Sequence, residues 1–298
     1  MKKVITRSVL ILVVVYVVLS ALSWKGEYDA ERSLWNINKQ MDLVSREPES
    51  TPDAAFSQLI ERYRSFIKAY PHSPLAPEAY MFIAKVDLIK KNYDAARKDL
   101  AQIPVDFPND KENIVRALAA IGETYEWQGN WNKARSQYES IIRQYPTTTV
   151  GLKLPLYIAS QEAKNEPSDV PALYTEVIRQ YKNLEERYPQ KEIKVEALKM
   201  LCTASLMRQD WRNSIQYAKQ MMFMNYTDKS IGEAMLIINR VSILRMKDYD
   251  TPIAIYKEFI KKYPDHPMYA VIKRMVASIE MLKKKNLTFT APVPQNSK

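Results

Sequence analysis

The stretch LAAIGETYEWQGNWNKARSQYESIIRQYP, residues 118–146, decides the fold because its landmarks recur along the chain. It reads as a helix, a polar turn at Asn130-Trp131, a second helix and a stop at Tyr145-Pro146. Asn and Gly favour the turn, and proline stops the second helix because it cannot continue the backbone hydrogen-bond ladder. The stretch therefore predicts a helical hairpin.

The proline stop recurs at a nearly regular spacing. The aromatic-proline pairs are Tyr70-Pro71, Phe107-Pro108, Tyr145-Pro146, Tyr188-Pro189 and Tyr263-Pro264. Successive prolines lie 37, 38, 43 and 75 residues apart, and the last interval is two periods long, with Asn225-Tyr226-Thr227 near its midpoint. A period of about 34–40 residues is typical of a helical solenoid.

A second landmark is an aromatic residue in the polar turn of each hairpin. Tyr93, Trp131 and Tyr249 each lie 15 residues before a stop proline, and Trp211 lies 16 residues before Thr227. Each repeat therefore reads as helix A, a tight turn, helix B and a stop. The copy at 151–189 has a longer loop at 165–171, and the copy at 231–264 has Arg240 where a small residue is expected.

The composition agrees with an all-helical chain. With 298 residues the chain favours two domains or a repeat array, and 5 glycines are too few for a β-rich or Rossmann-like fold. The single cysteine, Cys202, excludes an intramolecular disulfide. The net charge of +10 is dispersed over helices and is typical of solvated faces. Contact with anionic lipid or an acidic partner is the alternative, and we expect no nucleic-acid partner.

The first residues, MKKVITRSVLILVVVYVVLSALSWKGE, have the pattern of a membrane-targeting segment. Lys2, Lys3 and Arg7 precede an apolar run from Val9 to Leu22, which fits either a signal peptide or a short membrane anchor. The Trp24-Lys25 flank favours an uncleaved transmembrane helix over residues 1–24. We expect a single-pass inner-membrane protein with its solenoid in the periplasm, or a periplasmic or secreted protein if the segment is cleaved.

The remaining chain divides into a solenoid at residues 25–286 and a disordered tail at 287–298. The first hairpin joins helices at 28–43 and 55–69, and a final helix at 268–284 caps the last hydrophobic face. The tail contains two prolines and has no helical pattern.

The copy at 118–146 resembles the tetratricopeptide repeat (TPR) family, with Gly122, Trp131, Ala134 and Tyr138 at its motif positions. The resemblance implies an all-α, right-handed superhelical solenoid of about six TPR-like hairpins plus a capping helix. Gly122, like Ala84 in the preceding copy, allows close helix approach, while Tyr138 fills the gap between hairpins. Cys202 lies at the same small position, which predicts a buried, inert thiol.

The segment KAYPHSPLAPEAYMFIA, residues 68–84, is similar to the TPR variant of periplasmic BamD and CpoB-like proteins. This resemblance implies a periplasmic assembly or scaffolding module. The chain has just two histidines, His72 and His266, both in inter-repeat turns, and contains no phosphate loop or hydrolase motif. We therefore predict no catalytic residue, metal site or cofactor.

The resemblance also implies that helix A residues outside the packing stripe line a concave face. Positions two, five, nine and twelve of helix A differ by 3, 4 and 3 residues, so they form one stripe. A protein partner is the predicted ligand of this face. The candidate partner-binding residues are Glu78, Met81, Lys85, Leu88, Arg116, Glu123, Glu126, Trp127 and Lys199.

These patterns predict a non-enzymatic, membrane-tethered TPR scaffold that binds a protein partner in the cell envelope, for assembly of an envelope complex. One alternative is a structural subunit packed permanently inside a larger membrane complex. Another is an accessory to polysaccharide export that binds glycan through its aromatic residues. A transient adaptor should be soluble and monomeric without its anchor, whereas an obligate subunit should aggregate.

Overall fold

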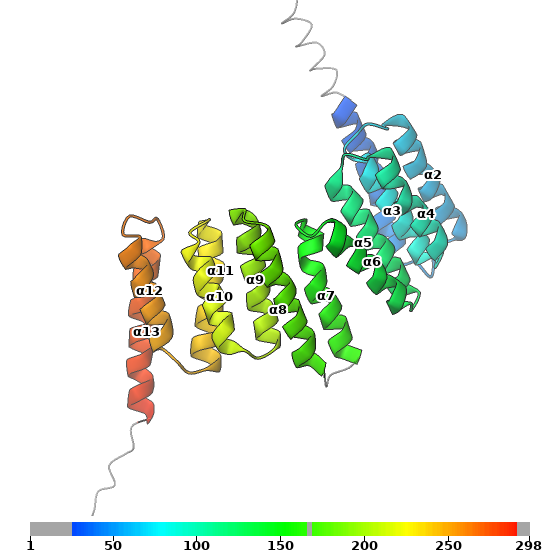
Figure 1. Ribbon diagram of the computed structural model, residues 1–298. Helices are drawn as coiled ribbons and strands as arrows, with labels where there is room; N and C mark the ends of the chain where they lie inside the picture. The colour runs from blue at the N-terminus through cyan, green and yellow to red at the C-terminus, as the bar shows by residue number, and fades with distance from the viewer. Residues whose placement is uncertain (1–25, 166–168, 291–298) are drawn as a thin grey trace, which may run out of the picture. The chain divides into compact units, whose positions relative to one another are not determined.

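The computed structural model describes residues 26–165 and 169–290, and it is all-α over these ranges (Figure 1). The predicted membrane segment at 1–24 and residues 291–298 of the predicted tail lie outside them. Within the described ranges, no helix combines the length and the apolar content that a bilayer crossing requires.

The described helices form six successive hairpins and a final single helix. The first three pairs are residues 26–46 with α2 (Asp53–Ala69), α3 (Ala76–Ile89) with α4 (Tyr93–Asp106), and α5 (Lys111–Trp127) with α6 (Trp131–Gln144). The next three are α7 (Thr149–Asn165) with α8 (Val170–Arg187), α9 (Lys191–Met207) with α10 (Trp211–Phe223), and α11 (Asp228–Asn239), continued by the π-helix η2 (Arg240–Arg245), with α12 (Asp250–Lys262). The single helix is α13 (Tyr269–Thr290). The predicted succession of helical hairpins is confirmed.

The chain divides into two compact units, one ending at Val150 and one beginning at Gly151. Buried side chains of the first unit form clusters that include Tyr63 and Leu100. A separate cluster in the second unit includes Tyr181 and Tyr256. The predicted solenoid at 25–286 therefore contains two stacks of hairpins, each with its own hydrophobic core.

The aromatic-proline pairs end helix B in every copy that carries one. Each aromatic residue follows the last helical residue and donates its backbone N–H to the carbonyl four residues earlier, at 2.8–3.0 Å. The following proline has no N–H to continue this ladder. These capping residues are Tyr70, Phe107, Tyr145, Tyr188 and Tyr263. The predicted stops are confirmed.

The turn between helices A and B contains a residue in the left-handed conformation. The φ angle is +61° at Lys91, +75° at Gly129, +62° at Gln209 and +57° at Lys247. In each of these four hairpins the aromatic landmark lies two residues later. Tyr93, Trp131 and Trp211 are the first residues of helix B, and Tyr249 directly precedes α12. Only one copy places glycine at this position, and each L side chain costs about 1 kcal/mol there.

A buried side chain eight residues before each stop proline fills the centre of the hairpin. In five copies it is at most 1% exposed: Tyr63, Leu100, Tyr138, Tyr181 and Tyr256. In the hairpin of α5 and α6 the residue opposite is Gly122, and a Cβ built on it would lie 2.2 Å from Cε1 of Tyr138. The prediction that Gly122 permits close packing against Tyr138 is confirmed.

The tyrosine hydroxyls in this row all donate to groups on helix A. Tyr63 donates to Asn38 Oδ1 at 2.8 Å, and Tyr138 donates to Glu126 Oε1 at 2.6 Å. Tyr181 donates to the carbonyl of Leu152 at 2.6 Å. These bonds satisfy polar groups that would otherwise be buried without a partner.

The sixth hairpin explains why Arg240 departs from the repeat pattern. One extra residue is accommodated by η2, so the N–H of Asp248 bonds to the carbonyl six residues back, at Ser242. In the hairpin of α5 and α6 the equivalent bond, from Asn130 to Tyr125, spans five residues. Asn239 therefore takes the inward position and accepts the Tyr256 hydroxyl at 2.8 Å, whereas Arg240 is exposed.

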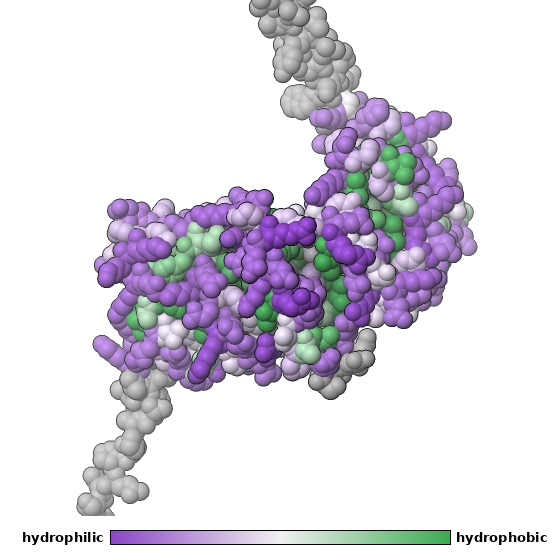
Figure 2. All heavy atoms as spheres, in the orientation of Figure 1, coloured by the Kyte–Doolittle hydropathy of each residue, from purple (hydrophilic) through white to green (hydrophobic). Residues whose placement is uncertain are grey.

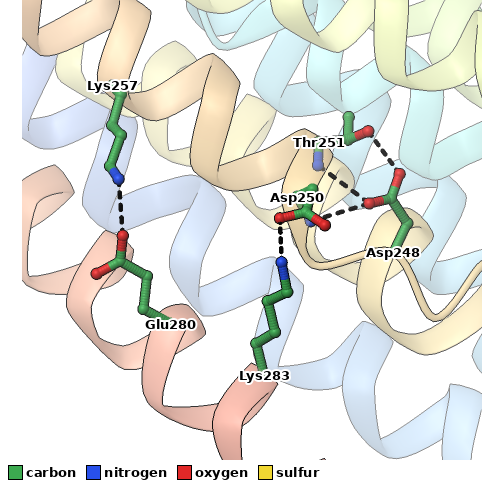
Figure 3. A network of polar contacts seen from close by, with 6 residues as sticks. All are labelled: Asp248, Asp250, Thr251, Lys257, Glu280 and Lys283. Carbon is green, nitrogen blue, oxygen red and sulfur yellow. Dashed lines mark hydrogen bonds and ion pairs between the residues drawn. The ribbon is translucent and has the colours of Figure 1, made fainter. Parts of the chain in front are cut away.

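The helix α13 caps the second unit. Ile272, Val276 and Ile279 are buried on its inner side. Its polar side forms ion pairs to α12, where Glu280 pairs with Lys257 at 2.7 Å and Lys283 pairs with Asp250 at 2.5 Å (Figure 3). The described helix runs to Thr290 and thus overlaps the first four residues of the predicted tail at 287–298.

The carboxylate of Asp248 lies beside the Lys283–Asp250 ion pair and binds backbone N–H groups at the start of α12. Asp248 accepts hydrogen bonds from the backbone N–H groups of Asp250 at 2.9 Å and Thr251 at 3.0 Å (Figure 3). Burial would raise its pKa, but these bonds and the charge of Lys283 outweigh burial and hold the pKa below its usual value. The acids at this turn therefore already have partners within the fold.

Candidate functional site

The predicted site residues lie on the A helices of both units. Eight of the nine are in the first unit, on α3 and α5, whereas Lys199 lies on α9 in the second unit. We call the outward stripe of helices 26–46, α3 and α5 the first A-helix face. The corresponding stripe of α9, α11–η2 and α13 is the second A-helix face.

The four candidates on α3 differ in accessibility. Lys85 is exposed, whereas Glu78 is half-buried. Met81 and Leu88 are also half-buried because they pack against the core cluster that contains Ala84 and Leu100. The α3 portion of the face therefore presents mainly the charged group of Lys85, with apolar side chains partly engaged in the fold.

The candidates on α5 include one residue that holds the hairpin together. Half-buried Glu126 accepts the hydroxyl of Tyr138 at 2.6 Å, so its carboxylate stabilises the contact between α5 and α6. Glu123 is exposed to solvent on one side, but protein atoms surround the rest of its side chain. This desolvation, and to a smaller extent the negative charge of Glu126, raise the pKa of the Glu123 carboxyl group. Arg116 is exposed and donates to Asn113 Oδ1 at 2.9 Å.

Trp127 is the most exposed large apolar side chain of the first unit, at 68%. It lies at the last residue of α5, where its carbonyl accepts the Tyr93 hydroxyl at 3.2 Å. The backbone is thus held by the fold while the indole remains in solvent. A rigid aromatic side chain in this setting has the properties of a binding anchor.

Lys199 contributes to an ion pair between successive A helices of the second unit. Its Nζ lies 2.9 Å from Oε2 of Glu233 on α11. Both side chains are about one-third accessible, at 33% and 30%, so the pair is screened by water and contributes little stability. A partner can reach this pair from solvent.

The sequence interpretation missed two exposed residues on the first helix, Trp35 and Leu43. Trp35 is 57% exposed, and Lys39 Nζ lies 3.6 Å above its ring. Both residues line a shallow depression with Asn38, Lys39 and Asp42. The sequence offered one signal, because Tyr63 lies eight residues before Pro71, as Tyr138 does before Pro146. The structure adds the bond from Tyr63 to Asn38, which aligns this helix with the other A helices.

Exposed apolar side chains gather on the A helices of both units. Among the described residues, ten of the twelve exposed large hydrophobic side chains lie on A helices, and Val105 alone lies on a helix B. Figure 2 shows apolar patches broken by polar groups on the visible side of each unit. The ten are Tyr28, Trp35, Leu43, Trp127, Met207, Leu236, Leu244, Val271, Met281 and Leu282.

The groups with potential chemical reactivity are engaged in the fold. Cys202 is fully buried, and burial raises the pKa of its thiol to about 12, so the thiolate form is suppressed. His266 accepts the N–H of Met268 at 3.0 Å, and its ring packs against Phe259. Over the described ranges, no three His, Cys, Asp or Glu side chains gather where they could hold a metal ion.

The comparison with known families identifies one repeat. Residues 116–148 match the tetratricopeptide repeat family. Tetratricopeptide repeat proteins are typically non-enzymatic scaffolds that bind protein partners. No curated protein sequence matches the chain.

Two of the solved structures that match this chain are yeast proteins. Yeast Tom70 is 12% identical, with a TM-score of 0.44 over 83% of this chain and 47% of Tom70. The chain thus spans about half the length of that protein. The TPR2AB domain of yeast Sti1, in a complex with pHSP90, is 13% identical, with a TM-score of 0.29 over 82% of this chain and 98% of that chain.

Proposed function

We propose that this protein is a non-enzymatic scaffold that binds a protein partner through its A-helix faces. The supporting observation is the concentration of exposed apolar side chains on the A helices, at ten of twelve positions among the described residues. Exposure of the apolar side chains of Trp127 and Leu236 to water is unfavourable, and neither side chain belongs to the buried clusters. Such groups suit contact with a second macromolecule.

The mechanism is presentation of a preformed surface. The tyrosine bonds and the capped turns hold the A helices in place before binding, so little conformational entropy is lost when a partner docks. A few anchors then supply most of the binding energy, and Trp35 and Trp127 are the aromatic anchors of the first A-helix face. Charged neighbours such as Lys85 and Arg116 set the register of the partner.

The proposal extends to the location of the protein. The basic and apolar pattern of residues 1–24 supports a membrane tether, with the repeats on the periplasmic side of an inner membrane. The similarity of residues 68–84 to periplasmic BamD and CpoB-like repeats supports a role in assembling a cell-envelope complex.

Affinity capture with the full chain from membranes of the source organism tests this function. Replacing Trp35 and Trp127 together by Ala should reduce recovery of the partner by about ten-fold or more. The Val105→Ala variant is the matched control, because it removes an exposed apolar side chain from a helix B. Equal recovery by all three proteins in mild detergent would contradict binding through the A helices.

A further inference from the structure

The second A-helix face carries exposed apolar side chains on α11, η2 and α13. Leu236 on α11 is 71% exposed, Leu244 on η2 is 64% exposed, and Met281 on α13 is 60% exposed. Val271, ten residues before Met281 on α13, is also exposed. These side chains are available to one ligand that crosses consecutive repeats.

One member of this row occupies a position that recurs in other hairpins. Leu244 lies five residues after Asn239, the inward residue that meets Tyr256. In the first unit, Trp127 lies five residues after Gly122, and Leu43 lies five residues after Asn38. All three are exposed, whereas Ile89, five residues after Ala84, is half-buried against the core. The recurrence indicates a surface position that consistently carries an apolar group.

Positive charges interrupt the row within its own helices. Arg240 lies between Leu236 and Leu244 with a spacing of four residues on each side, and it is exposed. Arg274 lies three residues after Val271 and seven residues before Met281, and it is exposed as well. A helical spacing of three, four or seven places these groups on one side.

The nearby acids are already engaged. Glu233 pairs with Lys199 at 2.9 Å, and Asp250 pairs with Lys283 at 2.5 Å. Asp248 accepts the backbone N–H groups at the start of α12. Along α11, η2 and α13 the row therefore presents apolar groups and the guanidinium groups of Arg240 and Arg274, whereas α9 adds the exposed carboxylate of Glu196.

We propose that this face binds an acidic amphipathic helix of a partner protein. Leucine-type side chains of that helix would contact Leu236, Leu244 and Met281, and its Asp or Glu side chains would pair with Arg240 and Arg274. The inference rests on the proposed scaffold function and specifies the partner class for the second unit.

The interleaving of charge with apolar groups favours a protein over a lipid surface. A helix that lies in a membrane interface segregates its apolar face from its cations, because hydrocarbon does not accept a charge in the middle of the buried row. Arg240 and Arg274 lie within the apolar row. A partner helix with acids between its apolar residues matches this order, whereas a bilayer does not.

The first A-helix face does not have the same charge balance. On α5, Arg116 is accompanied by Glu123 and Glu126, and on α3, Lys85 is accompanied by Glu78. Repulsion from these carboxylates disfavours an acidic ligand at α3 and α5. The two units therefore differ in the partner segments that they select.

Selection from a phage library of random peptides, each long enough for about five helical turns, tests the partner class with the full chain in detergent. Enriched peptides should be net negative, with apolar residues spaced three and four apart. The paired change Arg240→Glu with Arg274→Glu should weaken a selected peptide by about ten-fold or more, and Leu236→Ser by about five-fold or more. The matched control Val105→Ser should bind the peptide as the unaltered chain does.

Three results would overturn the inference. One is an enriched pool without acidic bias, and another is equal weakening by Val105→Ser and Leu236→Ser. The third is lipid contact, measured with a fluorophore on Leu236→Cys in vesicles that contain the full chain. Cys202 is buried, so the label should be confined to position 236, and emission quenched by spin-labelled phosphatidylglycerol would assign the face to a membrane.

The capture experiment separates this inference from the proposed function. If recovery from membranes depends on Trp35 and Trp127 while the peptide pool has no acidic bias, the scaffold function stands and the partner class is wrong. If recovery is insensitive to both tryptophans and to Leu236, the scaffold function itself is wrong.

Discussion

Replacing Gly122 by Ala tests the packing that defines the third hairpin. The added methyl carbon would lie 2.2 Å from Tyr138 Cε1, 2.7 Å from Cζ and 2.8 Å from Cδ1. Carbon atoms in favourable contact are about 3.5–4.0 Å apart, so the ring or the helix must move by more than about 1 Å. Tyr138 is 1% exposed and its hydroxyl is held by Glu126, so the ring has no empty space to enter.

Two opposing effects determine the magnitude. Ala is favoured over Gly inside a helix by about 1 kcal/mol, which raises stability. Overpacking a well-filled core lowers it by about 1–3 kcal/mol, and disturbing a hydrogen bond to a charged group lowers it by about 1.5–3 kcal/mol. We expect a net loss of about 1.5–5 kcal/mol in the free energy of unfolding.

Two further variants provide the controls. Gly232 also lies inside a helix, α11, but a Cβ there would meet no atom within 4 Å, so Gly232→Ala should gain up to about 1 kcal/mol. The double change Gly122→Ala with Tyr138→Leu reproduces the Ala84 and Leu100 pair of the preceding hairpin. The double variant should lose less free energy of unfolding than Gly122→Ala and Tyr138→Leu lose in sum, by about 1 kcal/mol or more.

Urea unfolding of five proteins, the unaltered chain, the two glycine variants, Tyr138→Leu and the double variant, is followed by far-UV circular dichroism and measures these differences. Each transition is fitted separately because the two units have separate cores. If Gly122→Ala were as stable as the unaltered chain while Gly232→Ala gained stability, the ring would move without penalty. The close approach of α5 and α6 would then not depend on glycine.

Three other variants test the turns and the buried groups. Gln209→Gly should raise the free energy of unfolding by about 1 kcal/mol in urea, because it removes an L side chain from a left-handed residue, whereas Gln209→Ala should not. Asp87 is 4% exposed, and burial raises its pKa above the unfolded value near 3.8, so the native state binds the proton more tightly. Stability from this group therefore rises as pH falls from neutral through the native pKa. Asp87→Asn should abolish this rise in stability and should be more stable than the unaltered chain at pH 7. Urea titrations at several pH values measure both effects, and a steeper rise in the stability of Asp87→Asn as pH falls would contradict the argument. Cys202 should react with a maleimide over 100-fold more slowly in the native chain than in urea, by mass spectrometry, and equal rates would show that the thiol is accessible.

Landmarks that act locally could be predicted from the sequence. A proline stop and a polar turn depend on backbone chemistry within a few residues, so the ends of helix B at Tyr145 and Tyr263 were predicted correctly. The small position at Gly122 was also predicted, because a repeat presents the same neighbour in each copy.

The candidate site was less predictable, because accessibility depends on neighbouring helices. Helical spacing placed Glu126 on the outward stripe, yet a hydroxyl from α6 engages its carboxylate. Lys199 satisfied the same spacing but pairs with Glu233 on the next A helix. Trp35 was missed because the repeat pattern was not extended to the first helix, although Pro71 and Tyr63 define the alignment.

The sequence by itself determined the repeat period, the helix stops and the small packing positions. These properties follow from local backbone preferences and from residue volumes that recur in register. Only the tertiary structure decided that an extra residue is accommodated as a π-helix, which turns Arg240 outward and brings Asn239 to Tyr256. It also decided which outward side chains remain free of the fold. Both outcomes depend on atoms contributed by another helix, which spacing along one helix does not specify.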